Sequence, residues 1–379
     1  MDLKDIRVEI DEIDRQMVEL FCKRMELSVK VSQYKIENAL PVLDAGRERE
    51  KLAEVSRLAG EDMAGYVRTL YNTVFDMSRA EQEKYVHPTS PTAEKIKKSL
   101  ENTPKIFPTY SRVACQGMEG AYSQIAAQKL FGVPCINYYP DFEGVFKAVK
   151  NGECDYGVLP LENSTAGSVN LVYDLMMKYN FSIVRSTRLH IDHQLLAKEG
   201  TDLSEVKEVF SHPQAISQCA EFLRELSVKV TPCQNTAAAA KMVAESERGD
   251  VAALSSRSCA SLYGLSVLCP SAQDKGNNHT RFICISKNRE IYPGADKTSI
   301  MVVTPHRPGA LFRVMSRFNA LGINLVKLES RPIPDRDFEF MFYFDLETSV
   351  YSQEFLQLIA ELDFMCEDFR YLGSYSEVV

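Results

Sequence analysis

Hydrophobic residues recur every three or four positions along the first 37 residues of the chain, which is the spacing of one face of an α-helix. The repeat runs through Ile6, Ile10, Ile13, Met17, Leu20, Leu27, Val31 and Tyr34. Residues 38–43 break it with Pro41, and Asp44 can then cap a short second helix that ends near Gly60. A third helix follows, with an apolar side formed by Val67, Leu70, Val74 and Phe75.

The first helix is too long for its neighbours. At about 33 residues it would be roughly 50 Å in length, and one short and one medium helix cannot cover its apolar stripe. The pattern therefore predicts that residues 1–86 form an all-α bundle completed by a second chain, as an intertwined helical dimer.

The next part of the chain changes to strands and helices in alternation. Residues 87–111 are rich in Pro, Thr and Ser, and they read as a linker with room for a short basic helix. From 112 to 287, strand-like apolar runs alternate with helical patterns, which predicts an α/β domain with largely parallel sheets. Its length indicates two lobes with a cleft between them.

The last part, residues 298–375, reads strand, helix, strand, strand, helix, strand. This order is typical of a ferredoxin-like α+β domain. On the pattern alone, such a domain is equally consistent with a small dimerisation module.

The amino-acid composition argues against several classes of function. The 379 residues are 45% hydrophobic and 25% charged, as in ordinary soluble multidomain proteins. No apolar run is long enough to span a membrane, and the N-terminus is not a secretory signal. The ten scattered cysteines favour reduced thiols in the cytoplasm over disulfides or a zinc site. The net charge of −8 argues against a nucleic-acid partner, so an anionic ligand would need local arginines.

Charged and polar residues converge on the interior of the helical part. Arg24 and Lys35 are 11 positions apart and share a helix face, while Ser78 and Gln82 continue the apolar side of the third helix. Arg7 lies about a quarter turn or more from this face, so it is better placed to serve the partner chain's site. A solvated charged face explains each residue alone, but the convergence of the whole set predicts a binding site.

This set resembles the all-helical chorismate mutases over nearly the whole segment. The resemblance rests on CKRMELSVKVSQYK, DAGRERE and DMSRAEQ, with Arg7, Arg24, Lys35, Asp44, Arg47, Glu48, Ser78 and Gln82 as the site residues that it implies. The family rearranges chorismate to prephenate in a pericyclic step without a cofactor. By this resemblance, Arg7 of one chain and Arg24 of the other bind the substrate carboxylates. Lys35 and Gln82 would face the ether oxygen, where negative charge develops.

The stretch from Gly276 to Ser286 sets Thr280 and Arg281 at the start of an apolar strand. Thr-Arg-Phe at 280–282, LPLENSTAG at 159–167 and SHPQAISQC at 211–219 together resemble a prephenate dehydratase domain with a two-lobed, periplasmic-binding-protein-like fold. The resemblance implies that Thr280 hydrogen-bonds the departing ring hydroxyl of prephenate. Arg281 would bind the side-chain carboxylate or brace the loop. The cleft lining that it implies is Glu162, Asn163, Ser164, Thr165, Ser211, Gln218 and Phe282.

Two details of this resemblance stay open. Glu162 could donate a proton if burial raises its pKa. The loop GMEGAYS at 117–123 departs from the family, which often has Pro after the first Gly and Thr before Tyr, where Met118 and Ala121 stand here.

GALF at 309–312 and ESRP at 329–332 resemble the ACT regulatory domain attached to prephenate dehydratases. In that family these segments bind phenylalanine at a dimer interface, although Phe312 stands where Val is common. The inhibitor-binding residues that the resemblance implies are Gly309, Ala310, Leu311, Asn324, Leu325, Glu329, Ser330 and Arg331.

The three resemblances together indicate the bifunctional chorismate mutase/prephenate dehydratase family, taking chorismate to phenylpyruvate under feedback inhibition by phenylalanine. They imply no cofactor, no metal, no membrane or nucleic-acid partner, and a homodimer or larger homo-oligomer. Two alternatives remain: a dehydratase that prefers arogenate, and an amino-acid sensor without enzymatic activity.

Overall fold

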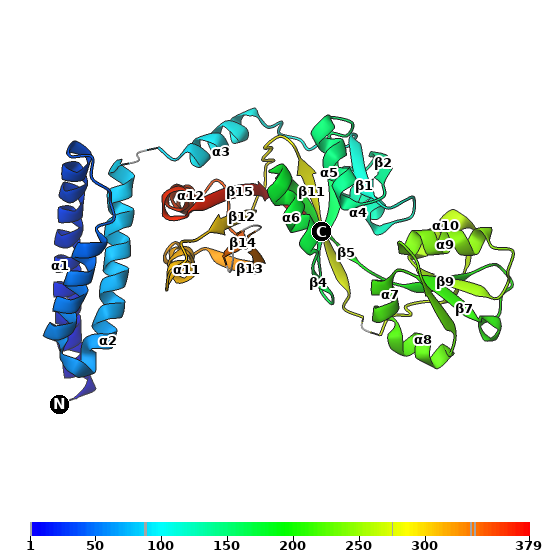
Figure 1. Cartoon of the computed structure of the whole chain (residues 1–379), viewed down its shortest axis with the longest axis horizontal. Helices are drawn as coiled ribbons and strands as arrows, with labels where there is room; N and C mark the ends of the chain where they lie inside the picture. The colour runs from blue at the N-terminus through cyan, green and yellow to red at the C-terminus, as the bar shows by residue number, and fades with distance from the viewer. Residues whose placement is uncertain (1, 87–88, 275, 334–335, 337–338) are drawn as a thin grey trace.

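Two long helices form the N-terminal part of the computed structural model, which describes residues 2–86, 89–274, 276–333, 336 and 339–379 (Figure 1). They are α1 (Leu3–Glu37) and α2 (Ala45–Val86), and they lie side by side. The backbone N–H of Arg47 donates to Asp44 Oδ1 at 2.9 Å, so Asp44 caps α2 as predicted. The second and third helices of the sequence analysis are the two halves of α2, which meet at a kink where Gly60 has φ +73°.

The apolar stripe of α1 is exposed in the single chain. Ile13 is 56% exposed, Met17 51% and Leu20 65%. Side chains of this kind are usually covered, and a contiguous exposed row of them marks an interaction surface.

The segment expected to be a linker contains a docked helix, α3 (Pro91–Asn102). Ile96 of α3 is fully buried in the core of the C-terminal part of the chain, and the hydroxyl of Thr92 donates to Asp363 at 2.6 Å. The short basic helix that the sequence allowed within residues 87–111 is therefore present, and its apolar face packs on the C-terminal part of the chain. Residues 87–88 of the expected linker lie outside the described residues.

The first lobe is built on a sheet with the strand order β16-β5-β11-β3-β1-β2, and β4 pairs with β3. Its strands are β1 (Arg112–Gln116), β2 (Cys135–Tyr139), β3 (Tyr156–Asn163), β4 (Gly167–Ser168), β5 (Ser182–His190), β11 (His279–Ser286) and β16 (Glu377–Val378). The associated helices are α4 (Tyr122–Phe131), α5 (Phe142–Asn151) and α6 (Asn170–Tyr179).

The second lobe has its own sheet with the order β10-β6-β9-β7-β8. Its strands are β6 (Gln194–Ala197), β7 (Glu208–Ser211), β8 (Lys229–Pro232), β9 (Val251–Ser255) and β10 (Ser266–Cys269). Its helices are η1 (Leu203–Glu205), α7 (Pro213–Gln218), α8 (Ala220–Leu226), α9 (Thr236–Glu245) and α10 (Arg257–Tyr263).

The chain crosses between the lobes twice, after β5 and again before β11. As it returns from the second lobe, β11 inserts between β3 and β5 and runs antiparallel to both. The two lobes are thus present, but the sheets are mixed instead of largely parallel. This return strand carries Thr280 to the boundary between the lobes.

The C-terminal unit, residues 297–375, follows the element order that its pattern predicted. It consists of β12 (Lys297–Val303), α11 (Ala310–Ala320), β13 (Asn324–Pro332), β14 (Phe340–Glu347), α12 (Gln353–Met365) and β15 (Asp368–Tyr375). The four strands form one antiparallel sheet in the order β13-β14-β12-β15. Phe344, Phe355 and Leu358 are fully buried in the core between this sheet and its helices.

The C-terminal unit packs directly against the first lobe. Met301 and Tyr343 of its sheet share a hydrophobic core with Tyr173 of α6 in the first lobe. Gly373 has φ +143°, and a Cβ there would lie 2.1 Å from the carbonyl oxygen of Ile183, so only glycine permits this approach of β15 to β5. After β15 the chain adds β16 to the first lobe's sheet. These contacts fix the C-terminal unit against the sheet of the first lobe.

Two candidate active sites and a candidate regulatory site

Polar side chains from α1 and α2 meet in a partly buried cluster, here called the helical pocket, which consists of Arg24, Lys35, Ser78 and Gln82. Arg24 donates to the Ser78 hydroxyl, and Lys35 Nζ donates to Gln82 Oε1 at 3.0 Å. Ser78 and Gln82 are each 6% exposed. The structure therefore brings together these four predicted residues from two helices.

The helical pocket contains two partly buried cations. Burial lowers the pKa of Arg24, and burial also lowers the pKa of Lys35, against the opposing effect of Asp44 and Glu48. In the described part of the chain, neither Arg24 nor Lys35 forms an ion pair with a carboxylate. Two desolvated cations without carboxylate partners suit an anionic ligand.

The remaining predicted residues of this site lie at its edge or outside it. Glu48 is hydrogen-bonded to Arg79, while the Arg47 side chain is 66% exposed. Arg7 is 17 residues before Arg24 on the same helix, a separation of about 26 Å at 1.5 Å per residue. A single chain therefore does not bring Arg7 to its own helical pocket.

A cleft of about 390 Å³ opens where the two lobes meet, here the interlobe cleft. Asn163, Gln218, Thr280 and Phe282 all line it, as predicted from sequence. Asn163 Nδ2 donates to Thr280 Oγ1 at 2.8 Å, which leaves the hydroxyl hydrogen of Thr280 available to a ligand. Gln218 of the second lobe donates to Thr165 of the first lobe at 2.8 Å, so these groups also tie the lobes together.

The lining of the interlobe cleft contains no lysine or arginine among the residues that the structure describes. Its titratable cations are His193 and His212, and burial lowers the pKa of both. The cleft is thus lined by amides, hydroxyls and apolar groups. Such a site places no fixed positive charge beside a carboxylate that must leave as CO2.

Glu162 and Arg281 do not line the cleft, because successive side chains of a strand point to opposite faces of the sheet. With Asn163 and Thr280 facing the cleft, Glu162 and Arg281 face the C-terminal unit. Arg281 is 5% exposed and forms ion pairs with Glu162, at 2.7 Å, and with Asp345. Of the two roles considered for Arg281, this geometry supports bracing. Glu162 also pairs with Lys327, so two cations hold its carboxylate away from the cleft.

Two serines that were predicted to line the cleft form hydrogen bonds outside it. Ser211 is fully buried and donates to the carbonyl oxygen of Leu254 at 2.7 Å. Ser164 donates to the carbonyl oxygen of Asn277 at 2.9 Å and joins two loops. Each hydroxyl satisfies a backbone carbonyl, so neither points into the cleft.

The sequence analysis missed His193 and Asn278. Both donate to Gln218 Oε1 at 3.0 Å with the tautomer that makes His193 Nε2 the donor. For His193, the sequence did hold a signal: the polar residues Asp192, His193 and Gln194 lie between two apolar strands, where the chain crosses from one lobe to the other.

At the start of α11, Gly309, Ala310 and Leu311 line a pocket of about 520 Å³ together with Phe340 and Phe342. Asn324 and Leu325 begin β13, and the Asn324 side chain donates to Glu347 at 3.0 Å. Ser330 lies on the exposed side of β13.

Glu329 and Arg331 lie away from that pocket and contact the first lobe. Glu329 accepts from Ser168 at 2.6 Å, and Arg331 pairs with Asp174 at 2.9 Å. Lys327, Glu329 and Arg331 alternate along β13, so their side chains share the face of the strand that contacts the first lobe.

Among the described residues, no group of three or more His, Cys, Asp or Glu side chains is arranged to hold a metal ion. Nor does the described part of the chain include a helix long and apolar enough to cross a membrane.

The helical pocket and the interlobe cleft are two separate candidate active sites in one multidomain chain, and the C-terminal unit packs against the lobe that carries the second. A family model described as chorismate mutase type II matches residues 6–83, and one described as prephenate dehydratase matches residues 113–290. The chain belongs to the family of bifunctional chorismate mutase/prephenate dehydratases.

Individual relatives agree. The bifunctional chorismate mutase/prephenate dehydratase of Escherichia coli (strain K12) is 32% identical over 381 residues, covering 98% of this chain and 95% of the relative. An arogenate dehydratase/prephenate dehydratase of Arabidopsis thaliana is 36% identical over 280 residues, covering 70% of this chain and 72% of the relative. The structure of prephenate dehydratase from Arthrobacter aurescens in complex with L-Phe is similar with a TM-score of 0.64 and 28% identity, covering 70% of this chain and 89% of that chain. Membership of an enzyme family displaces the sensor alternative.

Proposed function

We propose that the chain converts chorismate to prephenate in the helical pocket and prephenate to phenylpyruvate in the interlobe cleft, with phenylalanine acting through the C-terminal unit. The observation that carries the proposal is the partly buried hydrogen bond from Lys35 Nζ to Gln82 Oε1 at 3.0 Å beside Arg24, with no ion pair from either cation to a carboxylate among the described residues. Such a cationic pocket suits a substrate with two carboxylates.

The mutase step is pericyclic and has no covalent intermediate. The site therefore needs only groups that hold the substrate carboxylates and groups that stabilise the charge of the transition state. The Arg24 guanidinium can bind one carboxylate through two parallel hydrogen bonds. Lys35 and Gln82 supply an ammonium and an amide N–H for the ether oxygen, whose negative charge grows as the C–O bond breaks. Donors aimed at developing charge stabilise the transition state more than the substrate.

Arg7 would reach the helical pocket from a second chain. The exposed stripe of α1 supports a homodimer in which two such helices pack along each other. Asp44, Arg47, Glu48 and Ser78 would complete the substrate-binding set around each pocket.

In the dehydratase step, the bond from the ring to its carboxylate breaks, electrons move through the ring, and the ring C–O bond breaks. CO2 leaves, and the departing hydroxide takes up a proton to become water. Thr280 is suited to hydrogen-bond the departing hydroxyl, because Asn163 orients its Oγ1. Phe282 and Gln218 line the same cleft, and Thr165 accepts a hydrogen bond from Gln218. The described lining has no lysine or arginine, which avoids over-stabilising the carboxylate that is lost.

Phenylalanine would bind beside Gly309, Ala310 and Leu311 and contact Asn324 and Leu325 of a neighbouring copy, as in ACT domains. This assignment is supported by the pocket at the start of α11 and by the L-Phe complex of the Arthrobacter aurescens relative. Lys327–Glu162 and Asp345–Arg281 join the C-terminal sheet to residues adjacent to Asn163 and Thr280. Phenylalanine would inhibit by binding a less active arrangement more tightly than the active one.

Arogenate is the second candidate substrate for the cleft, because a relative that is 36% identical carries both dehydratase names. It has an amino group in place of the keto oxygen of prephenate. Competition between the two substrates in one reaction measures the preference directly. A higher kcat/KM for prephenate fits a chain that makes prephenate itself.

Separate loss of the two activities tests the proposal. Lys35→Ala should lower mutase kcat by about 10²–10³-fold, the usual cost of removing a donor to developing charge, and leave the dehydratase rate on supplied prephenate unchanged. Thr280→Ala should do the reverse, with Thr280→Ser as the matched control that keeps the hydroxyl. Wild-type turnover in either alanine variant would remove the corresponding assignment.

A further inference from the structure

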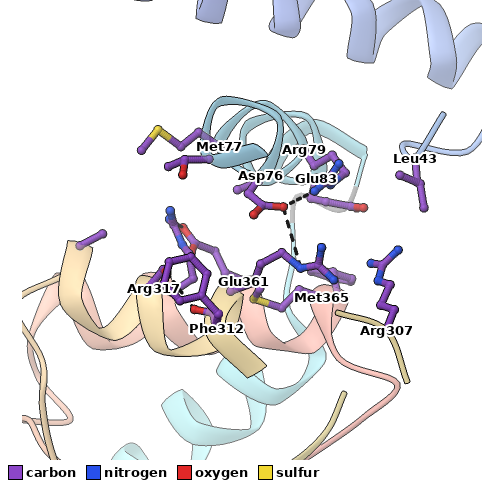
Figure 2. A pocket seen from close by; sticks show the side chains of 16 residues that line it. Leu43, Asp76, Met77, Arg79, Glu83, Arg307, Phe312, Arg317, Glu361 and Met365 are labelled. Carbon is purple, nitrogen blue, oxygen red and sulfur yellow. Dashed lines mark hydrogen bonds and ion pairs between the residues drawn. The ribbon is translucent and has the colours of Figure 1, made fainter. Parts of the chain in front are cut away.

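A charged contact joins the mutase helices to the C-terminal unit. A cavity of about 220 Å³ separates α2 from α11 and α12, and Figure 2 shows Asp76, Arg79 and Glu83 on its α2 side. Phe312, Arg317, Glu361 and Met365 lie on the opposite side. The same helix that sends Ser78 and Gln82 toward α1 therefore sends a second row of side chains toward the C-terminal unit.

Arg79 binds two carboxylates at once. One of its terminal nitrogens donates to Glu48 and the other to Asp76. The three side chains are 19%, 27% and 25% exposed, respectively, so water screens these pairs only in part. A planar guanidinium held at both ends has little freedom to move.

Asp76 has a second cationic neighbour across the cavity. Arg313 Nε of α11 lies 3.9 Å from Asp76 Oδ1. An unbroken chain of opposite charges thus runs from Glu48 through Arg79 and Asp76 to Arg313. It begins at the edge of the helical pocket and ends in the C-terminal unit.

The position of Glu48 at the start of α2 leaves its side chain mobile unless another group fixes it. It lies in the first turn of α2, before the Gly60 kink, while Arg79 lies 31 residues later in the second half of the helix. A glutamate in a first turn has several rotamers available, and fixing one of them costs side-chain entropy. The fork of Arg79 selects one rotamer and also ties the two halves of α2 together.

We propose that Arg79 is a positioning residue for the mutase reaction, which holds Glu48 at the helical pocket and, through Asp76, makes that hold depend on Arg313 of the C-terminal unit. The proposal rests on the proposed role of Glu48 in the mutase site. Arg79 acts on the helical pocket through Glu48, and its side chain also lines the cavity next to the C-terminal unit.

Arg79→Met removes the fork while keeping the length of the side chain. It should lower mutase kcat/KM by about tenfold, because misplacing a substrate-contacting group costs rate without abolishing the reaction. Arg79→Lys keeps one charge but not the fork, and should recover part of the loss. The dehydratase rate on supplied prephenate should not change in either variant, which reports that the chain is folded.

A double-mutant cycle shows whether Arg79 acts through Glu48. Arg79→Met added to Glu48→Gln should cost little more than Glu48→Gln alone, since the residue being positioned is already altered. Full additivity of the two losses, or wild-type mutase constants in Arg79→Met, would overturn the proposal.

Charge reversal at the far end tests the link to the C-terminal unit. Arg313→Glu places a carboxylate beside Asp76, where it competes with Glu48 for Arg79, and should lower mutase kcat/KM about fivefold. Arg307→Glu is the matched control, because Arg307 lines the same cavity and makes the same charge change, but forms no ion pair with Asp76 among the described residues. If Arg313→Glu and Arg307→Glu lowered mutase kcat/KM equally, the proposed link from Arg313 through Asp76 to Arg79 would be refuted.

Lys35→Ala separates failure of this inference from failure of the proposed function. An inactive Lys35→Ala mutase with a normal Arg79→Met mutase refutes only the positioning role. Full activity of Lys35→Ala refutes the mutase assignment on which that role rests.

Discussion

Lys35 and Arg24 are partly buried between α1 and α2, and this burial lowers the pKa of both. A lysine that is easier to deprotonate is a stronger hydrogen-bond donor while it is charged, but it keeps its charge over a narrower range of pH. For Lys35 this range ends below the 10.5 of an ordinary lysine. The same desolvation that strengthens the clamp therefore limits it at alkaline pH.

The pH profile of the mutase should show this limit. Because the reaction needs the ammonium form, kcat/KM should fall as pH rises through the lowered pKa of Lys35. Lys35→Arg should retain part of the activity and lose the alkaline fall, since a guanidinium stays charged. An unchanged alkaline fall in Lys35→Arg would assign the titration to another group.

Helical spacing was sufficient to predict the helical pocket, because residues 11 apart on α1 and 4 apart on α2 share a face whatever the partner. The strand residues were harder. Alternation places Glu162 and Arg281 opposite Asn163 and Thr280. Their partners, Lys327 and Asp345, come from a different part of the chain. No local pattern in the sequence identifies such partners.

At the scale of elements, β3 and β11 connect the cleft to the C-terminal sheet. Their cleft-facing residues are Asn163 and Thr280, and the neighbours of these residues pair with β13 and β14. A shift of β13 would therefore move the strands that carry Asn163 and the hydroxyl of Thr280. This path is short and runs through discrete ion pairs, so removing one pair tests whether it couples the two sites.

Lys327→Met should weaken phenylalanine inhibition of the dehydratase by about tenfold in the half-inhibiting concentration, within the usual range of allosteric coupling, while preserving the uninhibited rate. The measurement is dehydratase rate against phenylalanine concentration. The matched control is Arg370→Met, which removes another contact with the first lobe, from Arg370 to the carbonyl oxygen of Met177 at 2.9 Å, away from the cleft strands. Equal desensitisation by both variants would show that the interface as a whole, not this pair, transmits the signal.

Element types were largely predictable, but their partners were not. The periodicity of α1, the break at Gly60 and the order of elements in the C-terminal unit all follow from local sequence. The docking of α3 through Ile96 and the insertion of β11 between β3 and β5 depend on surfaces contributed by distant segments. An amphipathic pattern indicates that a face will be covered and does not say by what.

At the scale of the whole molecule, the exposed stripe of α1 and the remote position of Arg7 have one explanation in a shared mutase site. Each helical pocket would take Arg24 and Lys35 from one chain and Arg7 from the other. The dimer would then be required for catalysis and not only for stability.

Mixing two inactive variants tests this sharing. Arg7→Ala and Arg24→Ala should each have little mutase activity alone. After unfolding and refolding together, the mixture should regain about a quarter of the wild-type rate, because half the dimers are mixed and each mixed dimer has one of its two sites intact. No recovery in a mixture shown to contain mixed dimers would place Arg7 and Arg24 in the same chain's site or outside the site altogether.

The most direct test of the account follows purified protein with chorismate as the only substrate, measuring chorismate loss and phenylpyruvate formation with and without phenylalanine. The account predicts that phenylpyruvate appears without any added metal or nucleotide and that phenylalanine suppresses it. If chorismate disappears and prephenate accumulates in the absence of phenylalanine, the helical pocket is correctly assigned and the assignment of Thr280 and the interlobe cleft is contradicted.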